Sequence, residues 1–162
     1  MTFEIRQANI DDLDRVTYIE ASCFPPMEAA SKESFKQRID SFPESFLLGV
    51  MDGEIVTMVN GCVTNSKTIF DELFHDAKLH NKENDYQSVF GLCTLPDYQK
   101  QGLAEIMLTT LIEVAQERGK KGVILTCKKQ LIKYYEKFGF VNLGVSKSEH
   151  GGAVWYDMII EF

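Results

Sequence analysis

Hydrophobic and polar positions along the chain follow the two periodicities that distinguish helices from strands. Apolar residues recur at helical spacing in residues 9–23, 31–41, 102–118 and 130–138. Alternating or continuously apolar runs predict strands at residues 2–8, 46–51, 54–63, 87–95, 122–127, 140–147 and 153–162. The chain is therefore expected to combine helices and strands in one α/β fold.

Local signals separate these elements. Asn9, with Asp12 three residues later, is typical of a helix amino terminus, and the proline pair that begins at Pro25 ends that helix. Asp52-Gly53 between two apolar runs predicts a hairpin turn. The predicted strand 122–127 contains the continuous apolar run VIL, so both of its faces should be buried. The order of strand 87–95, helix 102–118 and buried strand 122–127 predicts a βαβ unit with parallel strands.

Residues 65–86 interrupt this pattern with a polar, charge-rich stretch. We expect one short helix and a loop there, inserted before the next strand. His75 and His80 lie in this insert, and we expect them to be surface residues rather than bases or metal ligands.

Composition places the chain among ordinary globular proteins. With 162 residues and 44% hydrophobic residues, residues 1–162 are expected to form a single domain. No apolar run approaches the roughly 18 residues of a membrane span, and the first residues are neither basic nor apolar, which favours a cytoplasmic protein without membrane contact. The cysteines contain no C-x-x-C pair, so we expect reduced thiols and no metal site: Cys23, Cys62, Cys93 and Cys127.

Charge narrows the range of partners. The formal net charge is −7, and no stripe of Lys and Arg interleaved with aromatic residues is present, which disfavours nucleic acid. An acidic surface attracts cationic small molecules, amines among them. We expect a monomer or a homodimer.

The junction QKQGLA connects a predicted strand to a predicted helix. Such a junction directs unpaired backbone N–H groups and the positive end of the helix dipole at one point, which favours phosphate. Gly102 allows close approach to the backbone, Ala104 keeps the first turn narrow, and Lys100 adds a positive charge. From these residues alone, a phosphate site and a simple tight turn are both possible.

Gln99, Gly102 and Ala104 satisfy the pattern [Q/R]-x-x-G-x-[G/A], and this stretch resembles the acetyl-coenzyme-A (acetyl-CoA) loop of the GNAT superfamily of N-acetyltransferases. The resemblance implies acetyl-CoA as co-substrate, with the pantetheine arm along the preceding strand and the pyrophosphate at the loop. The residues implied in cofactor binding are Leu92, Cys93, Thr94, Gln99, Lys100, Gln101, Gly102, Leu103, Ala104 and Glu105.

Residues 127–140 contain a second motif. An aromatic stripe at helical spacing is usually packing, and Tyr134 and Tyr135 could both be core residues. The segment nevertheless matches C-x-x-x-L-[VI]-x-[FY]-Y-x-[KR]-F-G-F and resembles the arylalkylamine (serotonin) N-acetyltransferase branch. The resemblance spans about residues 88–144 and implies that Tyr135 is the proton donor to the CoA thiolate. It also implies that Leu92 and Thr126 contact the acceptor substrate.

The resemblance fails at the proton acceptor. That branch has two histidines on the strand entering the cofactor site, where this chain has Ser88 and Phe90, neither of which can accept a proton at neutral pH. Asp85, Glu83 or Glu28 could act through water, although solvated loop carboxylates are the more common interpretation. The base is left unassigned.

These observations together predict a GNAT-like fold: a mixed, mostly antiparallel twisted sheet of about seven strands with a central parallel βαβ unit and about four helices on both faces. The predicted function is transfer of acetyl from acetyl-CoA to a primary amine of a small molecule. Two alternatives remain open, a protein or peptide N-acetyltransferase and a non-catalytic acyl-CoA-binding sensor. The segments 65–86 and 24–30 are expected to form the walls of the acceptor pocket.

Overall fold

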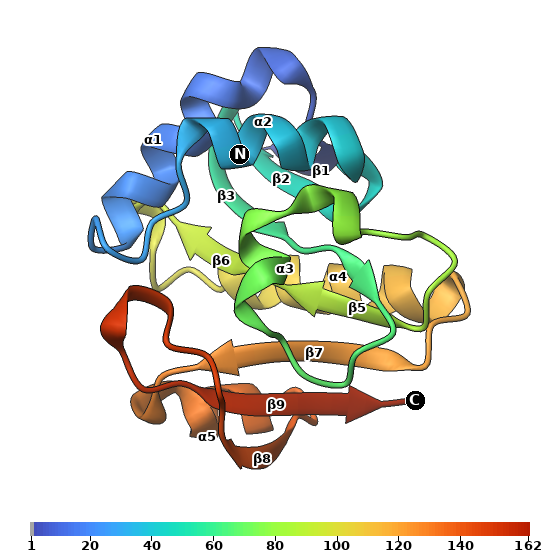
Figure 1. The fold of residues 1–162 in the computed structure, drawn as a ribbon. Coiled ribbons are helices and arrows are strands. Elements are labelled where there is room, and N and C mark those ends of the chain that lie inside the picture. Colours follow the sequence, from blue (N-terminus) through green and yellow to red (C-terminus); the bar gives the residue numbers. More distant parts are fainter. Residues whose placement is uncertain (1) are drawn as a thin grey trace.

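The computed structural model describes residues 2–162 and shows an α/β fold with two sheets (Figure 1). The first sheet has the strand order β1 (Phe3–Gln7), β2 (Phe46–Met51), β3 (Glu54–Asn60) and β6 (Gly91–Thr94). The second has the order β4 (Val63–Thr64), β5 (Tyr86–Val89), β7 (Gly122–Cys127), β9 (Tyr156–Glu161) and β8 (Val141–Val145). The helices are α1 (Leu13–Cys23), α2 (Lys32–Ser41), α3 (Asp71–His75), α4 (Leu103–Glu117) and α5 (Ile132–Glu136).

Pairing is antiparallel throughout except between β5 and β7, which run parallel with Val89 opposite Leu125. The helix α4 connects β6 to β7, so the predicted βαβ unit is present. The predicted fold class is confirmed, in a form with nine strands and five α-helices in the described residues.

The strand predicted at residues 87–95 is divided at Phe90. Its first half, β5, pairs with β7, whereas its second half, β6, pairs with β3. The Phe90 N–H donates to the Asn60 carbonyl at 2.7 Å, which fixes the point of division. Beyond Phe90 the two sheets separate, so β6 and the carboxyl end of β7 have no strand between them.

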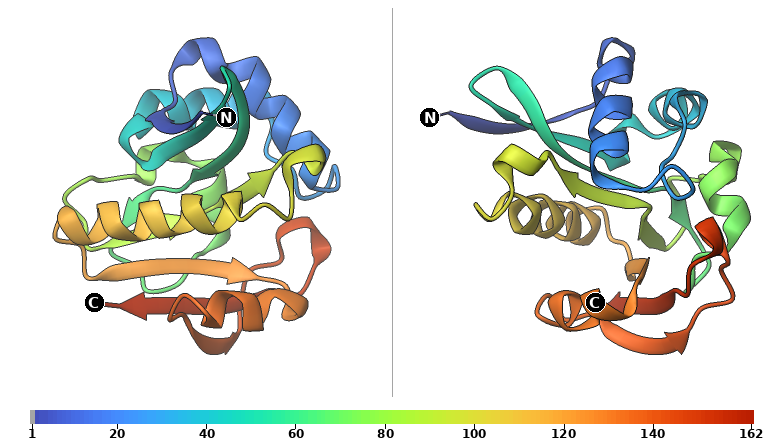
Figure 2. Two further views of the ribbon diagram at one scale, coloured as in Figure 1. Left: turned by 180° about the vertical axis from the view of Figure 1, so that it is seen from behind. Right: turned by 90° about the vertical axis from the view of Figure 1, so that its left-hand side faces the viewer.

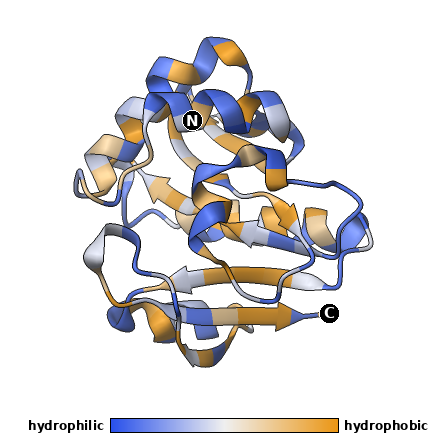
Figure 3. Ribbon diagram, viewed as in Figure 1, coloured by the Kyte–Doolittle hydropathy of each residue, from blue (hydrophilic) through white to orange (hydrophobic). Residues whose placement is uncertain are grey.

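Helices cover the sheets on both faces (Figure 2). On one side α1 and α2 bury Val16, Ile19, Phe35 and Ile39 against the first sheet. On the other side α4 packs against strands of both sheets and bridges their separation. The apolar residues are concentrated on the strands and on the inner helix faces (Figure 3), and this packing holds the two sheets at a fixed divergence.

Other local predictions also differ from the structure. The strand predicted at residues 54–63 is divided, since β3 ends at Asn60 in the first sheet and Val63 belongs to β4 in the second. The helix predicted at residues 130–138 is a 3-10 turn (Lys129–Leu131) followed by the shorter α5. The insert contains one short α-helix, α3, as expected, but the prediction that His80 is a surface residue is wrong. Only 7% of its side chain is exposed, and its ring contacts Glu44 and the Val63 N–H.

Among residues 2–162, no helix has the length and hydropathy that a membrane crossing requires.

Candidate active site

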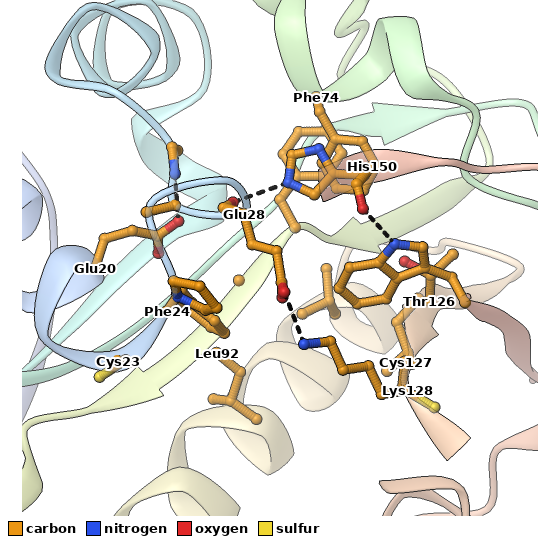
Figure 4. A pocket seen from close by; sticks show the side chains of 18 of the residues that line it. Glu20, Cys23, Phe24, Glu28, Phe74, Leu92, Thr126, Cys127, Lys128 and His150 are labelled. Carbon is orange, nitrogen blue, oxygen red and sulfur yellow. Dashed lines mark hydrogen bonds and ion pairs between the residues drawn. The ribbon is translucent and has the colours of Figure 1, made fainter. Parts of the chain in front are cut away.

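A cavity of about 450 Å³ lies where β6 and β7 separate (Figure 4). β6 is the edge of the first sheet. β5 ends at Val89, so the carboxyl end of β7 extends past β5 without a neighbouring strand on that side. The walls come from α1, the loop between α1 and α2, α2, α3, the ends of β5, β6 and β7, α5, and the loop before β9. Segments 24–30 and 65–86 both contribute, as expected, through residues such as Phe24 and Phe74.

The predicted phosphate turn forms the junction between β6 and α4. Gly102 is the residue at the helix start and has φ 81°, and Lys100 also has a positive φ, 63°. A Cβ placed on Gly102 would meet no atom within 4 Å, and no side chain from the described residues caps the helix. The first-turn amides therefore remain available to an anion. Gln99 Nε2 donates to the Thr94 carbonyl at 3.0 Å and ties the turn to the strand.

The side chains predicted along the pantetheine arm have different surroundings. Leu92 lies in the cavity, together with Thr126 at the end of β7. Cys93 and Thr94 are buried, Cys93 toward Glu20 on α1 and Thr94 against the Thr57 hydroxyl at 2.9 Å. Because neither of these two side chains lines the cavity, only their backbone could contact a ligand there. At the turn, Leu103 is likewise buried, whereas Gln99, Lys100, Gln101, Gly102 and Glu105 are exposed and Ala104 is half-buried.

Tyr135 of α5 lines the cavity, whereas Tyr134 does not. The two rings meet edge to face at a centroid distance of 5.2 Å, and Tyr135 also packs on Phe140. Burial raises the pKa of Tyr135 well above its usual value, with smaller contributions from Cys127 and Tyr134. The phenol is therefore protonated throughout the physiological range.

Cys127 is a second cavity residue with a buried polar group. Burial raises the pKa of its thiol to about 11, and the thiol contacts the Met158 sulfur at 3.4 Å. A thiol with a raised pKa is a poor nucleophile at neutral pH.

Two buried charged residues that line the cavity were not predicted as site residues from the sequence. Glu20 and Arg38 are each 5% exposed, and both line the cavity. A signal was present, because Glu20 follows Val16 and Ile19 on one stripe of α1, and Arg38 lies beside Phe35 on the corresponding stripe of α2. A charged residue on an apolar stripe is uncommon unless it has partners or a function.

Arg38 is held by polar and aromatic contacts. One guanidinium nitrogen donates to Asn60 Oδ1 at 3.0 Å and the other to the Phe74 carbonyl at 3.1 Å. The guanidinium also lies 4.8 Å from the centroid of the Phe90 ring. Desolvation lowers the pKa of Arg38 to about 10, so it remains a cation at neutral pH.

Four residues, Glu28, Lys128, His150 and Trp155, bridge opposite sides of the cavity, and we call them the clasp. Glu28 Oε2 pairs with Lys128 Nζ at 2.7 Å, and the Glu28 carbonyl contacts His150 Nε2 at 2.8 Å (Figure 4). The indole N–H of Trp155 donates to the His150 carbonyl at 2.8 Å. Gly151, at φ 65°, allows this approach, because a Cβ there would lie 2.6 Å from Glu28 Cγ.

Of the three carboxylates considered as bases, only Glu28 lies in the cavity, and it is paired with Lys128. Asp85 pairs with Lys121 at 3.2 Å before the start of β5, and neither it nor Glu83 lines the cavity. The Ser88 hydroxyl is buried and donates to the Cys62 carbonyl, so it has a structural role. No cluster of three potential metal ligands occurs anywhere in residues 2–162.

His75 is exposed, as expected, but lies at the cavity wall near His150. His150 and Trp155 were not predicted as site residues. They come from a polar loop whose sequence contains no motif, and only the fold brings that loop to the cavity.

Comparison with known families gives a match over most of the chain. The family model described as "Acetyltransferase (GNAT) family" matches residues 13–140. A curated relative, described as the probable hydrolase YhcX of Bacillus subtilis, is 20% identical over 128 residues, which cover 75% of this chain and 25% of that protein. The matched region is thus about a quarter of that relative's length.

Two solved structures have similar folds. One is described as the GphF GNAT-like decarboxylase in complex with isobutyryl-CoA, with a TM-score of 0.81, 17% identity and coverage of 98% of both chains. The other is the ribosomal-protein-S18-alanine N-acetyltransferase of Escherichia coli, with a TM-score of 0.72 and 19% identity. It covers 99% of this chain and 94% of its own. At these identities the likeness concerns the fold.

Proposed function

The chain belongs to the acetyltransferase (GNAT) family. We propose that it is an acetyl-CoA-dependent acyltransferase that acetylates the primary amine of a small molecule. In this proposal the amine attacks the thioester directly and Tyr135 protonates the departing thiolate. The cavity between β6 and β7, next to the uncapped amino terminus of α4, is the observation that carries the proposal.

The cofactor-binding part of the proposal rests on the β6–α4 junction. Uncapped first-turn amides, the positive φ of Gly102 and the open space above it suit the pyrophosphate of acetyl-CoA. Lys100 supplies an exposed cation beside this turn. The free edge of β6 offers backbone groups to the amides of the pantetheine arm, as an added strand would use them.

The catalytic part of the proposal rests on Tyr135. In water a phenol is a weaker acid than a thiol by about 1.5 pKa units, so proton transfer to a thiolate is uphill by roughly 2 kcal/mol. Burial raises the pKa of Tyr135 further, but it also raises that of the Cys127 thiol in the same cavity to about 11. Burial would also raise the pKa of a CoA thiol formed there, so the pKa values of the proton donor and the proton acceptor would rise together.

The acceptor class is inferred from the clasp and the aromatic walls. The clasp joins the α1–α2 loop to the end of β7 and to the loop before β9, so it crosses part of the cavity, whereas an extended peptide requires an open groove. Phe24, Phe74 and Trp155 provide aromatic surface, and Glu20 provides a carboxyl group. These features suit a compact primary amine with an apolar or aromatic body, in accord with the resemblance to the arylalkylamine branch.

A thiol-release assay with a panel of small amines and short peptides tests the proposal. We expect the best turnover with a compact amine such as phenethylamine. Faster turnover with peptides than with every small amine would assign the chain to the protein or peptide N-acetyltransferases. Acetyl-CoA binding without thiol release from any acceptor would indicate the non-catalytic sensor.

A further inference from the structure

Two of the four cysteines lie together where the carboxyl end of α1 packs on β6. Cys23, the last residue of α1, is half-buried and lines the cavity, whereas Cys93 of β6 is only 5% exposed. Cys23 Sγ lies 3.2 Å from the Thr94 carbonyl oxygen. Cys93 Sγ lies 3.9 Å from Oε1 of Glu20, about one helical turn before Cys23. These contacts place both sulfurs in the same narrow space between the helix and the strand.

The two thiols form a hydrogen-bonded pair. The Cys93 thiol donates to the sulfur of deprotonated Cys23, and this bond is the main cause of the lowered pKa of Cys23. Burial and the charge of Glu20 act in the opposite direction. The same bond, together with burial, raises the pKa of Cys93. Cys23 is therefore the thiol of the pair that ionises first, and it is also the one that a small molecule in the cavity can reach.

The other two cysteines differ from this pair. Burial raises the pKa of both Cys62 and Cys127. The Cys62 sulfur accepts from the Ser88 hydroxyl at 3.5 Å, and the Cys127 sulfur contacts that of Met158 at 3.4 Å. Of the four thiols, only Cys23 combines a lowered pKa with access from the cavity and a neighbouring thiol.

We propose that Cys23 and Cys93 are a redox-sensitive pair, in which hydrogen peroxide oxidises Cys23 and Cys93 then closes a disulfide that slows acetyl transfer. The Cys23 thiolate attacks one peroxide oxygen, and the O–O bond breaks to give a sulfenic acid and hydroxide. The proton that Cys23 had lost converts this hydroxide to water. The Cys93 sulfur then attacks the Cys23 sulfur, the S–O bond breaks, and the leaving hydroxyl takes the Cys93 proton as a second water. The sulfurs together lose two electrons, and the peroxide gains them.

The disulfide would change a wall that faces both substrates. A sulfur–sulfur bond is about 2.05 Å long, much shorter than a contact between two thiols, so the end of α1 and β6 must approach or the side chains must rotate. Both sulfurs also lose the hydrogens that they donate to Thr94 and Glu20. Leu92, next to Cys93, lines the cavity, and the proposed function places the pantetheine arm along the free edge of β6. The effect on activity rests on the proposed function, whereas formation of the disulfide does not.

Peptide mapping without reductant, after peroxide treatment of the reduced protein, tests the pairing. We expect a cross-link between Cys23 and Cys93, a protein mass lower by two hydrogen atoms, and reversal by dithiothreitol. In Cys93→Ala, oxidation of Cys23 should stop at the sulfenic acid, which dimedone labels. In Cys23→Ser, neither the cross-link nor this label should form. Cys62→Ala, which removes a cysteine outside the cavity, is the matched control and should give the wild-type cross-link.

Formation of N-acetylphenethylamine, measured after the peroxide is removed, tests the effect on activity. Because a displacement of about 1 Å in a site can cost roughly a hundredfold in rate, we expect the oxidised protein to be slower than the reduced protein by about tenfold or more. Dithiothreitol should restore the rate, and Cys23→Ser should have the same rate before and after peroxide.

The outcomes separate the two parts of the inference. Unchanged thiols after peroxide, a cross-link between other cysteines, or Cys23 oxidised without a cross-link in the wild type would overturn the pairing. A cross-link between Cys23 and Cys93 that leaves the rate unchanged would overturn the effect on activity. No acetylated amine from the reduced wild-type protein with any amine would overturn the proposed function, and the cross-link would still be tested by its mass.

Discussion

Tyr134 and Tyr135 are adjacent on α5, but only Tyr135 lines the cavity. Tyr135→Phe keeps the ring and its packing on Phe140 and removes the acidic proton. We expect turnover to fall by about a hundredfold to ten-thousandfold with acetyl-CoA affinity little changed. Steady-state kinetics and calorimetry measure the two effects. Tyr134→Phe should be nearly silent, and wild-type turnover in Tyr135→Phe with chemistry rate-limiting would show that the proton comes from elsewhere.

Gly102 permits the left-handed backbone at the start of α4 and leaves the space above it open. Gly102→Asp would place a negative charge where the pyrophosphate is proposed to bind, and we expect acetyl-CoA affinity to fall at least tenfold, about 1.4 kcal/mol. Gly102→Ala adds the backbone strain without the charge, so it should have a smaller effect. Unchanged affinity in a folded Gly102→Asp variant would remove the turn from the cofactor site.

The residues of the candidate site differ in whether the sequence alone identifies them. Gln99, Gly102 and Tyr135 belong to short motifs, so the sequence alone could select them. Glu20 and Arg38 belong to none, and their place in the cavity wall depends on the packing of α1 and α2 that only the folded chain creates. His150 is similarly remote in sequence from Glu28, whose carbonyl it contacts.

At the scale of elements, the first helical segment is anchored to β1 through Asp12. Its carboxylate pairs with both terminal nitrogens of Arg6 at 2.8 Å and accepts from the Asn9 N–H at 2.9 Å. The Arg6 hydrogen bond is the main cause of the lowered pKa of Asp12. The capping box predicted from Asn9 and Asp12 is confirmed.

Asp12→Asn weakens this anchor and should lower the free energy of unfolding at neutral pH by about 1–2 kcal/mol. Because the pKa of Asp12 is lowered in the folded state, its contribution is present above the unfolded pKa and is lost as pH falls through the folded value. Urea unfolding should therefore show the difference shrinking as the pH falls below the ordinary pKa of an aspartate, about 3.9. Asp14→Asn, an exposed carboxylate on α1, is the control. A difference that persists undiminished in acid would contradict this account.

The elements with local signals were predictable, and the division of one strand was not. Neighbouring residues determine the helix caps, the Asp52-Gly53 turn and the periodicity of α4. The break at Phe90 depends on which distant strands pair with each half, β7 with one and β3 with the other. The cavity follows from that break, so its position could be expected only through the resemblance to a family.

In the whole molecule, the clasp joins segments that are distant in sequence, and we expect it to limit the size of the acceptor. Gly151→Val would force a side chain against Glu28 and disfavour the backbone at φ 65°, so it should loosen the clasp. We expect kcat/KM for a bulky amine, such as a dipeptide amide, to rise relative to that for phenethylamine. A ratio unchanged in a folded variant would show that the clasp does not select the acceptor. Gly53→Val, in the distant hairpin with no atom within 4 Å of its Cβ position, is the control.

A single-turnover experiment with radiolabelled acetyl-CoA distinguishes direct transfer of acetyl to the amine from transfer through an acetylated cysteine. The pKa of the Cys127 thiol is raised to about 11, which argues against an acetylated cysteine there. Cys23, whose pKa is lowered by a hydrogen bond with Cys93, is the other cavity thiol. With enzyme in excess and phenethylamine present, we expect the label to pass into the N-acetylated amine as CoA thiol appears, with none retained on the protein. Label found on a cysteine before it reaches the amine, or released as free acetate, would contradict direct transfer.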